Sequence, residues 1–267
     1  MSGRGPFALA AALALALALA FLFLPILAVF LDTSPARLLA SLGEPSARDA
    51  LLLSLQTTSI ALVVVVAVGT PAAWLLATRS FRGRSLVITL VELPLVLPPV
   101  VAGIALLAAV GPEGIVGGAI EDAGLRLPLE MGGVVVALTF VASPFYVRQA
   151  QAAFGALEGS WLDASRTLGA SEARTFARVA VPAAAPGLAA GGALALGRAL
   201  GEFGATLVFA GSLQGVTQTV PLAISERYAS DFDGALALSA LLVIVSIAIL
   251  SAVKLVRGPE LLGRAAR

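Results

Sequence analysis

Six long runs of apolar residues, separated by charged or turn-rich segments, constrain this sequence more than any other feature. A helix needs roughly 20 mostly apolar residues to cross about 30 Å of hydrocarbon, because it rises about 1.5 Å per residue. Each run is long enough to do so. The sequence therefore predicts one all-α domain, residues 1–267, that forms a membrane helix bundle with spans at about 7–31, 50–77, 86–110, 132–152, 183–210 and 235–256.

Composition agrees with this prediction and excludes several kinds of function. Hydrophobic residues make up 59% of the chain and charged residues 12%, whereas a soluble domain has about 25% charged residues. The absence of His and Cys excludes disulfides, imidazole or thiolate catalysis and the usual nitrogen or sulfur metal ligands. We therefore expect no metal and no cofactor, and the net charge of +1 gives no support for nucleic-acid binding.

The sequence also lacks a phosphate-binding loop of the form GxxxxGK[ST]. Its one lysine, Lys254, follows Ala252 and Val253 rather than a glycine. An ATP-driven process would thus need a separate ATP-binding chain, and this chain is not expected to be an enzyme.

The distribution of basic residues predicts the orientation of the spans. If successive spans alternate sides from a cytoplasmic N-terminus, twelve of the seventeen basic residues lie inside: Arg4, Arg79, Arg82, Arg84, Arg148, Arg166, Arg174, Arg178, Lys254, Arg257, Arg264 and Arg267. The outer segments carry ten acidic residues and only four basic ones, Arg37, Arg48, Arg126 and Arg227. Because cytoplasmic loops are enriched in Lys and Arg, this favours six spans in the cell inner membrane with both termini cytoplasmic.

The first run admits a second interpretation, because Arg4 precedes a long Ala/Leu stretch, as in a secretory signal peptide. The run 7–31 exceeds the usual signal core of about 7–15 residues, which favours a retained span.

Helix-breaking residues gather in two of the runs. The third run contains Pro94, Pro98 and Pro99, and the fifth contains six glycines: Gly187, Gly191, Gly192, Gly197, Gly201 and Gly204. Backbone groups freed by proline must be satisfied by other helices, water or a ligand, and closely spaced glycines let helix backbones approach. Both runs are predicted to lie inside the bundle, either as kinked packing helices or as the lining of a path.

Three charged residues, Glu92, Arg198 and Glu202, fall within apolar runs, where a charge near the helix centre costs at least about 2.5–3.5 kcal/mol. Arg198 and Glu202 are four residues apart and share one helix face, so they can form an ion pair or line a wet cavity. Glu92 is close enough to the start of its run to reach the cytoplasmic interface.

The segment 153–182 is too polar to be a span and has helix-like composition with one break at Gly169. It suits one or two short helices that dock outside the bilayer. Its sequence LEGSWLDASRTLGASEARTFARVAVP resembles the EAA motif of ABC importer permeases. That motif consists of Glu-Ala-Ala, three further residues, Gly, nine further residues and then Ile-x-Leu-Pro. The EAA positions hold Asp163, Ala164 and Ser165, Gly169 follows after three residues, and nine more lead to Val179, Ala180, Val181 and Pro182.

This resemblance implies a coupling helix. In the family the motif inserts into a groove of a separate ATP-binding subunit, so Asp163, Ala164, Ser165, Gly169 and Pro182 are the expected coupling residues. Closure of two ATPase subunits would then rock the bundle between inward and outward states. Arg174 and Arg178 are further candidates for pairing with acidic groups of the ATPase, although topology alone also explains them.

Two further stretches resemble molybdate/tungstate permeases, a type I branch related to sulfate permeases. They are LPLVLPPVVAGIALL in the third run and ALGRALGEFGATLVFAG, followed by QTVPLAI, in the fifth; with the motif above, the likeness covers about 56–233. Sulfate permeases have Tyr and Ser near the positions of Phe203 and Ala205, so GEFGAT favours molybdate or tungstate. The resemblance implies a permease subunit for a tetrahedral oxyanion, with sulfate or thiosulfate as the alternative.

The expected translocation path contains Pro98, Pro99, Arg198, Glu202 and Thr206. Arg198 offers hydrogen-bond donors to an oxyanion, as do the hydroxyls and amides of Thr206, Ser212, Gln214, Thr217, Gln218 and Thr219.

The resemblance also implies partners: a second copy in a homodimer, two ATP-binding subunits, a periplasmic or lipid-anchored oxyanion-binding protein, and membrane lipid. Two other classes compete. An intramembrane enzyme is disfavoured by the missing His and Cys, and an ion-coupled secondary transporter would use Glu92 and Glu202 as its ion site.

Overall fold

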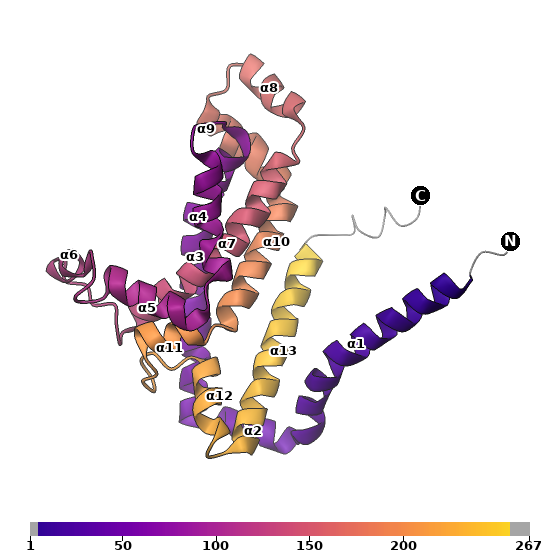
Figure 1. Cartoon of the computed structure of the whole chain (residues 1–267), viewed down its shortest axis with the longest axis vertical. Coiled ribbons are helices and arrows are strands. Elements are labelled where there is room, and N and C mark those ends of the chain that lie inside the picture. The colour runs from indigo at the N-terminus through magenta and orange to yellow at the C-terminus, as the bar shows by residue number, and fades with distance from the viewer. Residues whose placement is uncertain (1–4, 257–267) are drawn as a thin grey trace.

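The computed structural model describes residues 5–256, and this part of the chain is helical without strands (Figure 1). Its elements in chain order are α1 (Pro6–Asp32), α2 (Pro35–Gly43), α3 (Pro45–Thr78), α4 (Arg84–Val96), α5 (Pro99–Val110), α6 (Gly117–Asp122), α7 (Met131–Gly155), α8 (Gly159–Thr167), α9 (Glu172–Thr175), the π-helix η1 (Phe176–Ala180), α10 (Val181–Leu200), α11 (Gly204–Ala210), α12 (Val220–Tyr228) and α13 (Phe232–Val256).

The long helices agree with a membrane bundle. Five helical stretches of the described residues are long and apolar enough to cross a membrane, and α4 with α5 makes a sixth span if the bent pair is one span. The long stretches are Phe7–Asp32, Pro45–Thr78, Met131–Gly155, Glu172–Leu200 and Phe232–Ile249. The all-α fold class is confirmed.

Two of the predicted runs are not continuous helices. The run 86–110 is divided between α4 and α5, which are bent by 120° at the break. The run 183–210 is divided between α10 and α11, because the chain leaves the helix after Leu200 and resumes at Gly204. The sequence placed helix breakers in both runs, but it did not give the size of the bend or the position of the second break.

Helices α3, α7 and α10 form the centre of the bundle (Figure 1). A Cβ at Gly187 of α10 would lie 2.4 Å from Cβ of Ala153 on α7, and one at Gly69 of α3 would lie 2.8 Å from Cδ1 of Tyr146. Real side chains do not approach so closely, so glycine is what permits these backbone distances. The central position predicted for the glycine-rich run is therefore confirmed for α10.

The N-terminal helix α1 leans away from this centre and packs against α13 (Figure 1). No residue in its most apolar stretch is buried, and Phe21 and Leu24 are 79% and 67% exposed. An apolar face of this size requires lipid or another protein surface around it.

The two ends of the bundle carry the charges that the sequence assigned to opposite sides. At the end where α8 and α9 lie, Arg79 pairs with Glu172 at 3.4 Å. At the other end, near α2 and α12, Arg227 pairs with Glu44 at 2.5 Å (Figure 1). Arg4, Arg257, Arg264 and Arg267 lie outside the described residues, and the side chain of Lys254 is not described.

Candidate functional site

The first break lies between α4 and α5, at the two successive prolines. Leu97 has extended backbone angles, φ −69° and ψ 131°, as does Pro98 with ψ 139°, and α5 begins at Pro99. A residue before proline avoids the helical region, and proline at the first helical position needs no hydrogen-bond acceptor. The sequence Leu97-Pro98-Pro99 thus ends one helix and begins another within three residues.

The second break, at residues 201–203, is held by a buried carboxylate. Oε1 of Glu202 accepts a hydrogen bond from the backbone N–H of Ala205 at 2.8 Å, and Oε2 pairs with Nη1 of Arg198 at 2.6 Å. The Glu202 side chain is 1% exposed and that of Arg198 is 29% exposed. The carboxylate therefore satisfies one free N–H at the start of α11 and compensates the charge of the arginine in the last turn of α10.

The two breaks meet in space, because α11 packs along α5 across the long axis of the bundle (Figure 1). A Cβ at Gly204 would lie 2.6 Å from Cβ of Pro99, and one at Gly103 would lie 2.7 Å from Cβ of Val208. We call this contact the crossing of α5 and α11. It brings Pro99 next to the segment that carries Glu202 and Thr206, residues that the sequence analysis assigned to one path.

The remaining polar candidates divide into two groups. Thr206 is fully buried on α11, and its hydroxyl has no hydrogen-bond partner among the described residues; the buried hydroxyls of Thr139 on α7 and of Thr219, another predicted candidate, also have none. Thr217 and Gln218, by contrast, are engaged within the loop after α11. Oγ1 of Thr217 accepts from the N–H of Leu213 at 2.9 Å, and Nε2 of Gln218 donates to Ser212 and Glu226. Their hydrogen bonds hold the loop between α11 and α12 rather than face a cavity.

The third charge within an apolar run, Glu92 on α4, pairs with Arg148 on α7 at 3.4 Å. Glu92 and Glu202 thus have different arginine partners. Such a pairing does not form the joint carboxylate site that an ion-coupled transporter would need.

The segment between α7 and α10 forms two short helices followed by one π-helical turn. Gly169, between α8 and α9, has φ +79°, a conformation that glycine adopts without steric cost. Arg166 of α8 binds Asp163 at 3.1 Å and Glu172 of α9 at 3.2 Å, and the hydroxyls of Ser165 and Thr175 lie 2.9 Å apart. The hairpin around Gly169 is therefore internally braced.

An exposed apolar face of α8 was missed in the sequence analysis. Trp161 is 50% exposed and Leu168, the residue that follows the last residue of α8, is 88% exposed, and Ala164 lies between them, also exposed. Positions i, i+3 and i+7 share one side of a helix, so this spacing was the signal that could have identified the face. Leu162, on another side of α8, is buried against the bundle.

The π-helical turn η1 connects α9 to the bundle through aromatic packing. Phe176 lies 5.7 Å from Trp74 of α3 and 6.1 Å from Phe154 of α7, and Trp74 lies 5.3 Å from Phe154, measured between ring centroids. Pro182, the last residue of the motif, is the second residue of α10. A displacement of α8 and α9 would thus act on three helices of the core at once.

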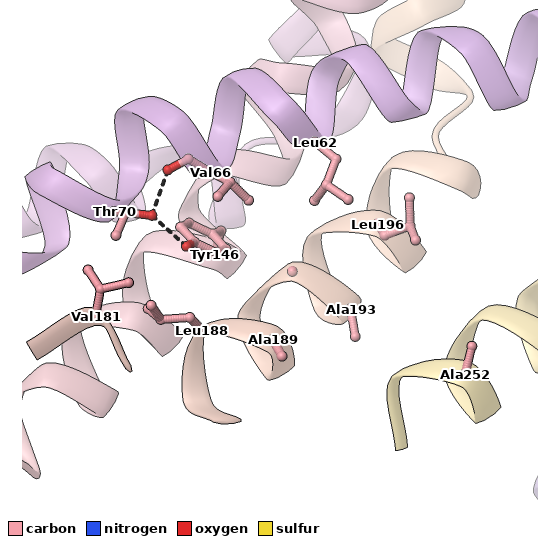
Figure 2. A pocket seen from close by; sticks show the side chains of 11 residues that line it. Leu62, Val66, Thr70, Tyr146, Val181, Leu188, Ala189, Ala193, Leu196 and Ala252 are labelled. Atoms are coloured by element: carbon pink, nitrogen blue, oxygen red, sulfur yellow. Dashed lines mark hydrogen bonds between the residues drawn. The ribbon is translucent and has the colours of Figure 1, made fainter. Parts of the chain in front are cut away.

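A cavity of about 460 Å³ between α3, α7, α10 and α13 has different chemistry (Figure 2). Its lining is apolar except for the hydroxyls of Thr70 and Tyr146, which lie 2.6 Å apart and hydrogen-bond to each other. With no charged group among its lining residues, the cavity does not suit a small anion.

Comparison with known proteins agrees with this architecture. Residues 66–257 match the family described as binding-protein-dependent transport system inner membrane component. The molybdenum transport system permease protein ModB of Mycobacterium tuberculosis is 42% identical over 223 residues, which cover 84% of this chain and 84% of that protein. A probable molybdenum ABC transporter permease protein of Haloferax volcanii is 40% identical over 227 residues, covering 85% of this chain and 81% of that protein.

Solved structures show the same fold at low sequence identity. A chain of a bacterial ABC transporter involved in the import of the acidic polysaccharide alginate has a TM-score of 0.76 at 16% identity, over 94% of this chain and 95% of that chain. A chain of the MetNI methionine ABC transporter in an inward-facing conformation has a TM-score of 0.60 at 20% identity, over 77% of this chain and 92% of that chain. The chain therefore belongs to the family of binding-protein-dependent transport system inner membrane components.

Proposed function

We propose that this chain is the permease subunit of an ATP-driven importer that carries molybdate or tungstate across the cell membrane. The observation that carries the proposal is the 42% identity to a molybdenum transport permease over 84% of both chains. The crossing of α5 and α11 supports it, because it places a guanidinium and a buried hydroxyl on either side of irregular backbone within the bundle. Irregular backbone at membrane depth is tolerated where it is buried in protein or lines an aqueous path.

The driving force comes from a second chain that binds ATP. This chain has no phosphate-binding loop, and α8 extends beyond the bundle with an apolar face that has no partner in the described part of the chain (Figure 1). Asp163, Ala164 and Ser165 lie on α8, and we assign the docking of the ATP-binding subunit to this helix together with Trp161 and Leu168. Gly169 and Pro182 set the shape of the segment behind it.

The proposed role as an importer permease implies a larger complex. Two copies of this chain form a homodimer with the path between them, two ATP-binding subunits dock at the cytoplasmic end, and a periplasmic or lipid-anchored binding protein delivers the anion at the other end. We place both termini on the cytoplasmic side, on the basis of the distribution of basic residues along the sequence. The exposed outer surface near Asp231 and Asp233, where Asp233 pairs with Arg37, is available to that binding protein.

Competition uptake tests the substrate assignment. Membrane vesicles that contain this chain, its ATP-binding subunit and its binding protein should accumulate labelled molybdate when ATP is supplied. Excess unlabelled tungstate should suppress the uptake, and an equal excess of sulfate should leave it nearly unchanged. Suppression by sulfate but not by tungstate would leave the importer architecture standing and would show that the substrate is sulfate rather than molybdate or tungstate.

A further inference from the structure

The two side chains of the Arg198–Glu202 ion pair differ in solvent exposure, and this difference affects how the pair can bind an anion. The Glu202 side chain is 1% exposed, with Oε1 accepting the Ala205 N–H and Oε2 in ionic contact with Arg198 but without a hydrogen bond, whereas the Arg198 side chain is 29% exposed. A guanidinium has five N–H donors, and Nη1 is the atom that contacts Glu202 at 2.6 Å. The carboxylate side of the pair is closed to a ligand, and the arginine side is open to one.

The position of the pair is fixed by the backbone around it. Glu202 is anchored through Ala205 N–H to the start of α11, and Gly204 of α11 packs against Pro99 of α5. Arg198 lies 17 residues after Val181, roughly 26 Å along α10. The pair therefore lies at the end of α10 that is far from α8, beside the crossing of the two broken helices.

Charge compensation matters for a group that must release its ligand. An isolated guanidinium in a poorly solvated site would hold a divalent anion strongly, and conduction requires that binding be weak enough for the ligand to leave. A carboxylate at 2.6 Å cancels most of this attraction while leaving N–H donors that orient the oxyanion.

We propose that Glu202 is a positioning residue of the anion path: it holds Arg198 at the crossing of α5 and α11 and compensates its charge, so that a divalent oxyanion is contacted there but not trapped. This inference rests on the proposed import of molybdate or tungstate. It assigns different roles to the two residues, since Arg198 touches the anion and Glu202 acts through Arg198.

Two measurements on the complex of this chain with its ATP-binding subunit test the inference. The first is the equilibrium binding of tungstate to the complex in lipid nanodiscs, without the binding protein. The second is the ATP-dependent turnover of tungstate uptake in proteoliposomes with the binding protein. Glu202→Gln should tighten tungstate binding by about tenfold, the size of one charge-assisted hydrogen bond, and should slow uptake. Glu92→Gln, which removes the other intramembrane carboxylate from its arginine, should change neither.

A role of Glu202 in packing alone would reduce assembly and uptake without tightening tungstate binding, and that result would overturn the inference. If Glu202→Gln fails to assemble, the double variant Arg198→Gln with Glu202→Gln removes the buried pair together and keeps the site neutral. It should assemble and bind tungstate more weakly than the unmodified complex, and unchanged binding would again overturn the inference. Absence of ATP-dependent oxyanion uptake by the unmodified complex would instead overturn the proposed function.

Discussion

At the scale of single residues, Gly204 determines how closely the two broken spans approach. Its missing side chain leaves room for Cβ of Pro99, an atom in a rigid ring that cannot rotate away. Gly192 on α10 offers a matched comparison, since a Cβ there would meet no atom within 4 Å. The same substitution at the two glycines should therefore have effects of opposite sign.

We predict that Gly204→Ala lowers the free energy of unfolding by about 1–3 kcal/mol, because the added methyl group forces α11 away from α5. Gly192→Ala should raise it slightly, since alanine favours a helix over glycine by roughly 0.5–1 kcal/mol. Thermal unfolding of the purified permease in detergent compares the two variants. Equal midpoints for both would show that the contact between Gly204 and Pro99 is not tight.

Gly169 has a conformational role rather than a packing role. It has φ +79°, and a Cβ there would meet no atom within 4 Å. Asparagine tolerates this backbone region better than other residues with a side chain. We expect Gly169→Asn to retain most of the uptake per ATP hydrolysed and Gly169→Glu to lose most of it, with both proteins inserted normally. Full coupling in Gly169→Glu would contradict the assignment of this turn to ATPase docking.

At the scale of secondary structure elements, we expect the apolar face of α8 to supply most of the free energy with which the ATP-binding subunit binds this chain. Tryptophan is enriched among the residues that dominate binding, whose truncation costs about 2 kcal/mol or more, and an apolar neighbour such as Leu168 helps to exclude water from around it. We predict that Trp161→Ala and Leu168→Ala each weaken binding of the ATP-binding subunit by at least about tenfold. Leu39→Ala on α2, at the opposite end of the bundle and 71% exposed, is the control. Pull-down of the ATP-binding subunit with titrated permease measures the change, and equal loss in all three variants would refute a specific role for α8.

The elements also show how far the sequence could predict the fold. Length and hydropathy identified the apolar runs, and the break expected at Gly169, in a segment predicted to form one or two short helices, separates α8 from α9. The 120° bend at Pro98 could not be predicted, because proline ends a helix without fixing the direction of the next one. The break after Leu200 was missed because the carboxylate that holds it, Glu202, lies in a sequence that reads as a continuous apolar run.

The same limit applies to the candidate site. The i, i+4 spacing of Arg198 and Glu202 allowed an ion pair, and the structure contains one. Their relation to Pro99 depends on contacts between residues about 100 positions apart, which no local pattern encodes. The helical spacing of Trp161 and Leu168 indicates that they share one face. That this face points away from the bundle follows from the packing of Leu162 against the core.

At the scale of the whole molecule, α8 at one end and the crossing of broken spans within the bundle are connected through the aromatic packing of Phe176 with Trp74 and Phe154. α10 runs from the π-helical turn to the break that Glu202 holds, so one helix joins the two sites. A movement of α8 can therefore reach Arg198 along a single helix of 20 residues. This connection is what an ATP-driven permease requires.

The measurement that tests this account most directly is tungstate uptake into proteoliposomes that contain the complex of this chain with its ATP-binding subunit, in the presence of the binding protein. We predict uptake that requires ATP on the side of α8 and persists after ionophores have dissipated proton and sodium gradients. Uptake that continues without ATP and stops when those gradients are removed would contradict the account, because it would make the chain an ion-coupled transporter.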